Sequence, residues 1–221
     1  MIDQPKRLQC GLCLRPQSAC ICQWIRPTVH TTEVLILQHP MEEHQAKGSA
    51  RLLHLSLPHS RLVVGERFDD AALRALLFAP FLPEENGCDN DRPVRPLLLY
   101  PLDDAVLDDR QWSPSQDSIT HATDSVRHRL VVLDGTWRKS RKMLHLNPLL
   151  QQLPRFALCN PPASHYAIRK AHHPDQLSTY EATCHALMEL EGNAERFAPL
   201  LQAFDGFIAQ QQSHVVHHAA G

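Results

Sequence analysis

The sequence lacks the features that mark membrane proteins and secreted proteins. In its 221 residues, no apolar run approaches the roughly 20 residues that a membrane-spanning helix needs. The amino-terminal residues contain no apolar segment of the signal-peptide type. The seven cysteines are odd in number and unevenly placed, which makes a poor framework for disulfides. We therefore expect a cytoplasmic protein that contacts no membrane, and no obligate protein partner is evident.

A large excess of charge of either sign is also missing. The net charge is -2 and the isoelectric point is about 6.7, so the whole molecule shows no sign of binding a polyanion. The distribution is uneven, because residues 66–109 hold eleven acidic side chains against four arginines, whereas residues 138–142 (RKSRK) hold four cations. Such a chain could present a cationic face to a polyanion. A solvated helix face is the simpler interpretation of the charge alone.

Short apolar runs alternate with helical patterns along the chain. The runs are rich in Val and Leu, as is typical of parallel strands buried on both faces. They lie at 33–38, 61–65, 96–101, 129–134 and 155–159. The helical patterns lie at about 42–57, 69–79, 136–146, 179–191 and 194–212, with less regular helical turns near 104–126. This order predicts an α/β fold, in which a mostly parallel sheet carries helices on both faces.

Four cysteines are crowded near the amino terminus. They are Cys10, Cys13, Cys20 and Cys22, in the pattern CxxC…CxC. Four thiolates can close a tetrahedral shell around a soft divalent ion, and zinc is the metal expected in a reducing cytosol. Two disulfides, four incidental thiols or an iron–sulfur cluster are the alternatives. We expect a structural zinc site, and we divide the chain into a zinc module (1–28), an α/β domain (29–212) and a disordered tail (213–221).

An aspartate stands at the end of the fourth predicted strand. In α/β sheets, ligands bind beyond the carboxyl ends of the strands, so Asp134 occupies a position where chemistry is usually found. The same residue could simply cap the helix that starts near Thr136, and Trp137 could simply be a core residue. From this stretch alone, cap and core are the simpler interpretation.

Further motifs favour a functional role for Asp134 and Trp137 over a purely structural one. HPxE, at 39–42, again follows a strand, and a YxIRK…LSTxEA pattern runs from 166 to 182. Together with the cysteine pattern and with Asp-Gly-Thr-Trp at 134–137, these motifs resemble the DTW-domain family, in the expected order and from about residue 8 to residue 190. In one departure, this chain has Gly48-Ser49 where the family usually has an Asn-Thr pair after HPxE, so a ligand contact made by that Asn is not expected here.

The resemblance implies a fold, a reaction and two substrates. The family is similar to the SPOUT class, whose α/β sheet carries a C-terminal trefoil knot that binds S-adenosylmethionine. Its members resemble tRNA-uridine aminocarboxypropyltransferases, which move the 3-amino-3-carboxypropyl group of S-adenosylmethionine, their co-substrate, to N3 of a uridine in tRNA and release methylthioadenosine. The rival interpretations are an S-adenosylmethionine-dependent RNA methyltransferase and a zinc-stabilised RNA-binding module without catalysis.

The resemblance also implies roles for particular residues. Asp134, Thr136 and Trp137 would form the catalytic motif, with Asp134 accepting or orienting the N3 proton and Trp137 stacking on a base. The residues expected to hold S-adenosylmethionine are Tyr100, Pro101, Leu133, Gly135, Arg169, Leu177, Ser178, Thr179 and Glu181. The residues expected to bind tRNA phosphates are Arg15, Arg138, Lys139, Arg141 and Lys142. A helix capping box explains Ser178 and Glu181 without any ligand.

Overall fold

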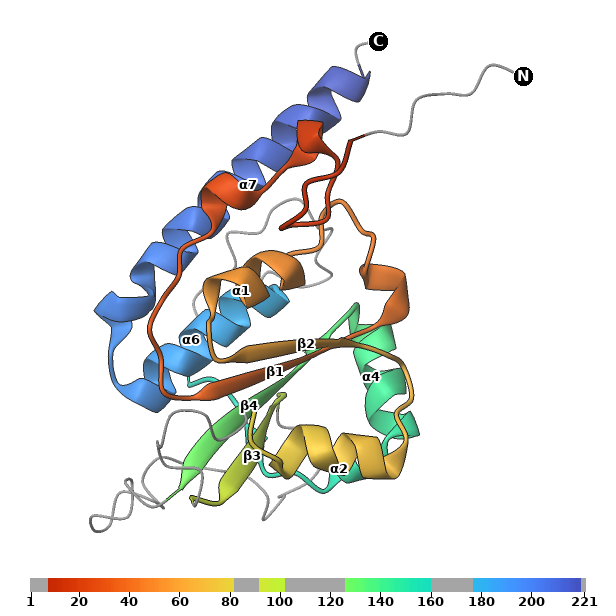
Figure 1. Ribbon diagram of the computed structural model, residues 1–221, viewed down its shortest axis with the longest axis vertical. Helices are drawn as coiled ribbons and strands as arrows, with labels where there is room; N and C mark the ends of the chain where they lie inside the picture. Colours follow the sequence, from red (N-terminus) through yellow and green to blue (C-terminus); the bar gives the residue numbers. More distant parts are fainter. Residues whose placement is uncertain (1–7, 82–91, 102–125, 160–176, 220–221) are drawn as a thin grey trace.

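A five-stranded parallel sheet forms the centre of the protein (Figure 1). The computed structural model describes residues 8–81, 92–101, 126–159 and 177–219. The strands are β1 (Glu33–Gln38), β2 (Ser60–Val64), β3 (Val94–Leu99), β4 (Arg127–Asp134) and β5 (Arg155–Phe156). Their order is β2-β1-β4-β3-β5, and every neighbouring pair is parallel. The expected α/β fold with a mostly parallel sheet is confirmed.

Helices cover both faces of this sheet. They are α1 (Ala50–Ser56), α2 (Asp70–Phe78), α4 (Trp137–Leu146), α5 (Pro148–Gln151), α6 (Thr179–Glu191) and α7 (Ala194–Ala219), and three short 3-10 helices lie at η1 (Gln17–Ala19), η2 (Cys22–Trp24) and η3 (Pro40–Glu42). Among the described residues, no helix combines the length and the apolar composition that crossing a membrane requires.

Two predicted helices differ from the structure. The helix expected at 42–57 begins only at Ala50, because a 3-10 turn at Pro40–Glu42 and a turn closed by the bond from Gly48 N to Gln45 O come first. Helix α7 continues past Gln212 to Ala219, into the stretch for which the sequence predicts a disordered tail. The helical turns expected near 104–126 fall almost entirely outside the described residues.

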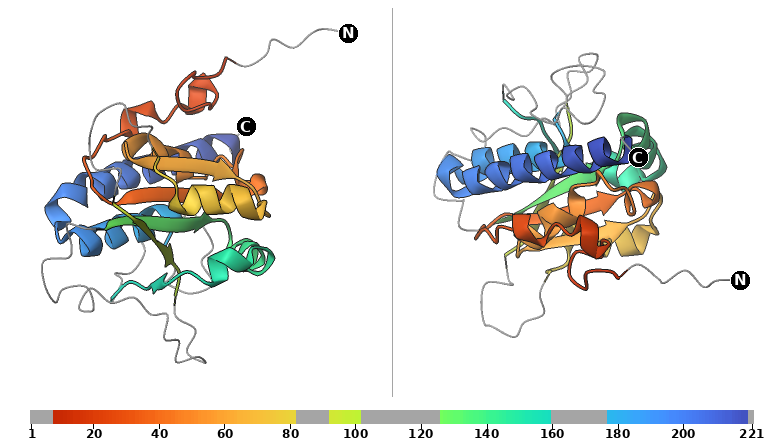
Figure 2. Two further views of the ribbon diagram at one scale, coloured as in Figure 1. Left: turned by 60° about the horizontal axis from the view of Figure 1, so that its bottom comes forward. Right: turned by 90° about the horizontal axis from the view of Figure 1, so that it is seen from above.

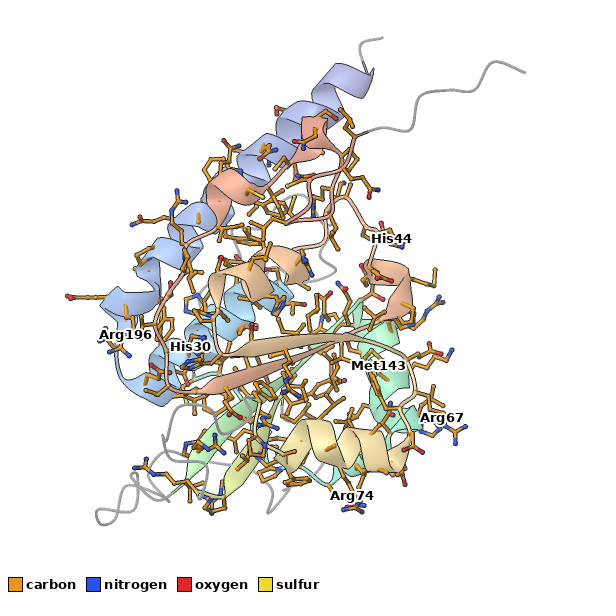
Figure 3. The ribbon with its side chains drawn as sticks, viewed as in Figure 1. His30, His44, Arg67, Arg74, Met143 and Arg196 are labelled. Carbon is orange, nitrogen blue, oxygen red and sulfur yellow. The ribbon has the colours of Figure 1, made fainter. Side chains whose placement is uncertain are left out.

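The strands bury alternate side chains in two separate cores. On one face, Ile36 and Val132 pack with residues of α1, α6 and α7. On the other face, Leu37 and Leu133 pack with residues of α2, α4 and α5, among them Met143, which points from α4 toward the sheet (Figure 3). Figure 2 shows α6 and α7 (blue) lying side by side in the first layer. The period of two along a strand therefore assigns each residue of β1 and β4 to one layer.

The segment that contains the four cysteines, residues 10–24, packs against the α/β domain. Its buried residues belong to the same hydrophobic core as residues of α1, α6 and α7. Ile21 is fully buried in the cluster that contains residues of α6 and α7, and the ring of Trp24 lies so close to Gly206 that a Cβ there would approach it within 2.1 Å. Gln210 of α7 accepts a hydrogen bond from Nε1 of Trp24 and donates one to Cys20 O. Figure 1 shows this segment (red and orange) alongside α7. The zinc module at 1–28 remains a predicted unit, but its described residues share this core.

A buried arginine closes the amino end of the sheet. The Arg129 side chain is fully buried and donates to the Glu33 carboxylate, to Leu76 O and to Ala79 O, and it lies 3.9 Å from the ring centroid of Phe81. These bonds satisfy carbonyl groups at the end of α2 that have no partner within the helix. The charges at this end of the sheet are thus used to fix α2, whereas those at the carboxyl end form the site described next.

Candidate active site

Two buried polar side chains meet where β1 and β4 end. Gln38 and Asp134 are the last residues of their strands and stand opposite each other in the parallel register. Nε2 of Gln38 donates a hydrogen bond of 2.9 Å to Oδ2 of Asp134. The exposed fractions of the two residues are only 4% and 3%. A buried carboxylate destabilises the fold unless it accepts hydrogen bonds, so the bond from Gln38 helps to stabilise Asp134 in this position.

The residue after Gln38 joins three elements. His39 N donates to Asp134 O at 2.9 Å, and His39 Nδ1 accepts a hydrogen bond from Met41 N at 3.1 Å. The other ring nitrogen must then carry the proton when the imidazole is neutral, so Nε2 donates to Oε1 of Glu66 at 2.8 Å. The HPxE histidine is therefore held in one tautomer, and it ties the end of β1 to β4 and to the segment after β2.

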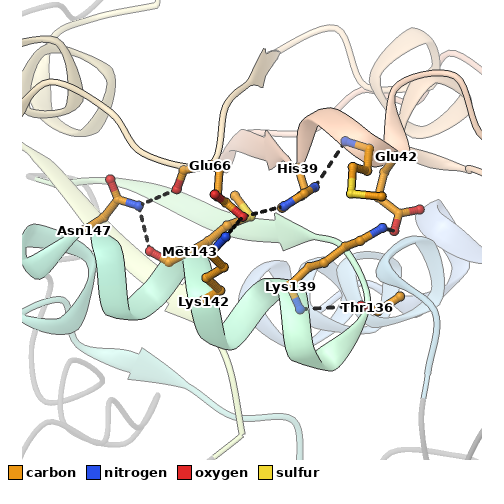
Figure 4. A network of polar contacts seen from close by, with 9 residues as sticks. His39, Glu42, Glu66, Thr136, Lys139, Lys142, Met143 and Asn147 are labelled. Atoms are coloured by element: carbon orange, nitrogen blue, oxygen red, sulfur yellow. Dashed lines mark hydrogen bonds and ion pairs between the residues drawn. The ribbon is translucent and has the colours of Figure 1, made fainter.

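Two lysines of α4 complete this network (Figure 4). Nζ of Lys139 lies 2.8 Å from Oε1 of Glu42, the acidic residue of HPxE, and Glu42 is only 4% exposed. Nζ of Lys142 lies 2.9 Å from Oε1 of Glu66. Lys142 and His39 together hold the pKa of Glu66 below its ordinary range. Both lysines expected at tRNA phosphates thus bind carboxylates of this chain.

The helix cap is Thr136 rather than Asp134. The Thr136 hydroxyl accepts from Lys139 N at 3.4 Å and starts α4, two residues after the buried carboxylate. Gly135, between these two residues, lies close to the first turn of α4. A Cβ at this position would stand only 3.1 Å from the Cβ of Lys139. The local capping role is filled by another residue of the motif, so the burial of Asp134 calls for a different explanation.

Trp137 and Tyr100 come together from the two segments that follow β4 and β3. Their rings meet edge to face, with centroids 5.9 Å apart. Trp137 is 40% exposed, so it is not a core residue. Arg155 lies 5.4 Å from the Tyr100 ring centroid and donates to Pro101 O at 3.4 Å. An exposed indole beside a strand end can stack on a base, the role expected from the sequence.

The start of α6 forms the capping box that the sequence predicts. The Ser178 hydroxyl accepts from Glu181 N at 3.2 Å, and the Glu181 carboxylate accepts from Ser178 N at 2.8 Å. Thr179 O accepts from the hydroxyl of Thr183. Leu177, the first described residue after the gap, is partly exposed. Arg169, the expected partner of the amino-acid end of S-adenosylmethionine, lies outside the described residues.

The sulfur atoms of the four clustered cysteines have the geometry of a metal site. Every Sγ lies within 4.8 Å of the others, with Cys10 and Cys22 3.5 Å apart and Cys13 and Cys20 3.8 Å apart. Tetrahedral zinc bound at about 2.3 Å by thiolates requires sulfurs about 3.8 Å apart, so the residues fit the ion. Backbone N–H groups of Cys13 and Leu12 help to hold the pKa of Cys10 at about 6. A thiolate is therefore available at neutral pH.

Arg15 points back to the body of the protein. Its guanidinium donates to Ala46 O and to Gly48 O, both at 2.6 Å, and lies 5.4 Å from the ring centroid of Phe207. Arg51 of α1 donates in turn to Leu12 O. The contacts of Arg15 fix the cysteine segment to the loop after HPxE, at the position where this chain has Gly48 and Ser49.

Comparison with known proteins assigns the family. The DTW domain, as a sequence family, matches residues 7–212. The chain belongs to the DTW-domain family. It is 29% identical over 219 residues to "tRNA-uridine aminocarboxypropyltransferase 2" of Mus musculus, a match that covers 95% of this chain and 65% of the mouse protein. It is 30% identical over 202 residues to the Drosophila melanogaster protein of the same name, with 87% of this chain and 71% of that protein covered. No solved structure matches the chain.

Within this DTW domain, several site residues could not be chosen from the sequence. Gln38 and Glu66 were not predicted, although each stands at or just after the end of a predicted strand, a position that could have marked them. His39 and Glu42 belong to the HPxE motif, but the sequence alone assigned no function to either residue. Glu42 pairs with Lys139 of α4, 97 positions along the chain, and Gln38 pairs with Asp134 of β4, 96 positions along it. No local pattern reveals such pairings.

Proposed function

We propose that this protein transfers the 3-amino-3-carboxypropyl group of S-adenosylmethionine to N3 of a uridine in tRNA. The observation that carries the proposal is the Asp134 carboxylate, buried and hydrogen-bonded at the carboxyl ends of two neighbouring strands within the motif that names the family. The name that the mouse and fly relatives share supports this choice of reaction. The chain spans 65% of the length of the mouse relative, so the activity of the whole relative is carried over only as a proposal.

The reaction needs a base and an ordered approach. Uridine N3 is a weak nucleophile while it carries its proton, and Asp134 would accept that proton as the new bond from N3 to the aminocarboxypropyl carbon forms and the bond from that carbon to sulfur breaks. S-adenosylmethionine supplies a sulfonium with three electrophilic carbons, and the one that lies in line with the nucleophile reacts. Placement of the donor would thus select this group over methyl.

The donor would lie along the carboxyl ends of β3 and β4. Tyr100, Pro101, Leu133 and Gly135 are at or directly beyond these ends, and Asp134 faces the layer that contains α6. The start of α6 would meet the carboxylate of the donor, because a helix amino terminus favours an anion. Since Ser178 and Glu181 already satisfy each other in the capping box, we assign the principal contact there to Arg169 and Thr179. The chain around this site would form a SPOUT-like trefoil knot that binds the donor.

The tRNA would be bound by one edge of α4. Arg138 and Arg141 are exposed, and neither has a hydrogen bond or ion pair among the described residues. They lie three positions apart, so they share a helix face that is offset from the one carrying Lys139 and Lys142. We therefore assign the phosphate contacts first to these arginines and then to Lys142, whose side chain is 59% exposed. Lys139 would instead position the motif, and zinc would stiffen the segment that Arg15 anchors.

Incubation of the purified protein with S-adenosylmethionine and bulk tRNA, followed by nucleoside mass spectrometry, tests the function. The expected products are 3-(3-amino-3-carboxypropyl)uridine and methylthioadenosine in equal amounts. A methylated nucleoside with S-adenosylhomocysteine would contradict the proposal in favour of a methyltransferase. Tight tRNA binding without binding of S-adenosylmethionine would contradict it in favour of a non-catalytic module. An Asp134→Asn preparation is the control for a contaminating enzyme.

A further inference from the structure

We propose that Gln38 is a positioning residue that orients the Asp134 carboxylate for catalysis, an inference that rests on the function proposed above. Gln38 belongs to neither the HPxE nor the D-x-T-W motif. Its amide contacts the Asp134 side chain, whereas His39 contacts the Asp134 backbone and Glu42 contacts α4. Among Gln38, His39 and Glu42, Gln38 is therefore the residue whose contact is made with the carboxylate of the proposed proton acceptor.

The backbone at both residues is already fixed. Gly65 N donates to Gln38 O at 2.9 Å, and His39 N donates to Asp134 O at 2.9 Å. Two residues earlier, Ile36 and Val132 pack into the core beneath α1 and α6, so the pleat turns Gln38 and Asp134 toward the same layer. The Asp134 carboxylate can still turn about its side-chain bonds unless side-chain donors restrain it, and the 2.9 Å bond from Gln38 is one such restraint.

A neutral donor suits this task better than the alternatives. A lysine or arginine at position 38 would neutralise the carboxylate and weaken it as a base. An apolar side chain would leave a buried acceptor with one donor fewer, and a glutamate would place two carboxylates within about 3 Å, so that one of them would hold a proton. Glutamine keeps the carboxylate oriented while its negative charge remains available to the N3 proton and to the sulfonium.

The test compares Gln38→Met with Gln45→Met. Methionine matches the length of glutamine but cannot donate. Gln45 is an exposed glutamine of the neighbouring loop whose amide donates to Met41 O, so it receives the same chemical change away from Asp134. Single-turnover rates and Kd values for both substrates should be measured at a temperature at which both variants are folded. Should Gln38→Met not fold, Gln38→Asn carries the same test, because its amide is one methylene too short to reach.

We expect Gln38→Met to lower the single-turnover rate roughly 10- to 100-fold while the Kd values for S-adenosylmethionine and tRNA stay within about twofold. Gln45→Met should resemble the wild type. If Gln38 acts through Asp134, adding Gln38→Met to Asp134→Asn should cause little further loss. A rate equal to wild type, or losses that multiply fully in the double variant, would overturn the inference.

A second measurement does not depend on activity. The side-chain amide resonances of Gln38, assigned by ¹⁵N NMR as the pair lost in Gln38→Met, should move in Asp134→Asn. If the wild-type protein makes no modified uridine, the proposed function fails, and the position of these resonances alone then decides about Gln38. Resonances that do not respond to Asp134→Asn would overturn the contact, and resonances that shift would support it.

Discussion

Among single residues, Asp134 is the one whose substitution should affect the reaction rate far more than the stability. Asp134→Asn keeps the volume and an oxygen that can accept from Gln38, so we expect a folded protein that has lost at most about 1 kcal/mol of unfolding free energy. Because an amide is not a useful base, the rate of transfer should fall roughly 100-fold or more. Single-turnover rates, measured against pH together with the affinity for S-adenosylmethionine, check this expectation.

A matched aspartate provides the control. Asp69 caps α2, where its carboxylate accepts from Ala71 N and Ala72 N at the protein surface. Asp69→Asn should cost a few tenths of a kcal/mol and leave the transfer rate unchanged. Near-normal turnover in both aspartate variants would remove Asp134 from the mechanism.

Among the elements, α4 is the one whose cations the proposed function divides between two tasks. Arg138→Gln with Arg141→Gln should weaken tRNA binding and reduce the slope of log affinity against log salt by about one unit for each lost phosphate contact. The unfolding free energy should hardly change, since both side chains are exposed. Binding isotherms at several salt concentrations provide the measurement.

Lys139→Gln is the contrasting variant on the same helix. Its partner Glu42 is 4% exposed, so loss of the ammonium removes a charged partner from a buried carboxylate and should cost about 1–3 kcal/mol. The salt slope of tRNA binding should stay as in the wild type. A reduced slope for Lys139→Gln, or an unchanged slope for the two arginine variants, would show that the two tasks are assigned to the wrong residues.

At the scale of the whole molecule, the cysteine cluster should stabilise more than its own segment. Ile21 and Trp24 pack against α7, so loss of the metal should loosen that helix along with the segment. We expect Cys10→Ser with Cys13→Ser, or treatment with a chelator, to lower Tm by roughly 10 °C. Metal analysis together with thermal unfolding checks this. Cys159→Ser, at an exposed cysteine outside the cluster, should change neither quantity.

Buried and half-buried histidines give the free energy of unfolding a predictable dependence on pH. Burial lowers the pKa of His30, His54 and His185. The His30 ring (Figure 3) is buried in its neutral form, with Nε2 accepting from His59 N and Nδ1 donating to Thr32 O. As the pH falls below the ordinary histidine pKa of about 6.5, the unfolded chain takes up protons before the folded protein does.

The unfolding free energy should therefore be fully present above pH 7 and should decline between about pH 6.5 and pH 5. Urea unfolding at several pH values measures it. His30→Gln should flatten the decline, since the unfolded state then has one titrating group fewer. A decline of equal steepness in this variant would assign the pH dependence to other groups.

The order of the elements, the parallel sheet and the cysteine cluster could all be predicted from the sequence. These depend on local properties: apolar runs between breakers, the helical period, and four thiols within a span short enough to meet. The place of Asp134 at a strand end also follows from its own run, RLVVLD. The length of the helix after HPxE was mispredicted, because Gly48 and the 3-10 turn at Pro40–Glu42 override the helical period.

The contacts of the polar residues at the site, in contrast, depend on how the elements pack in three dimensions. Placing β1 beside β4 brings Gln38 to Asp134, and packing α4 across the sheet edge brings Lys139 to Glu42 and Lys142 to Glu66. In the sequence, these lysines look like part of one basic block with their arginine neighbours. Ion pairs form between side chains that the fold brings within about 4 Å, whatever their separation along the chain, so neither a charge count nor a local motif distinguishes a cation held by the fold from one that faces solvent.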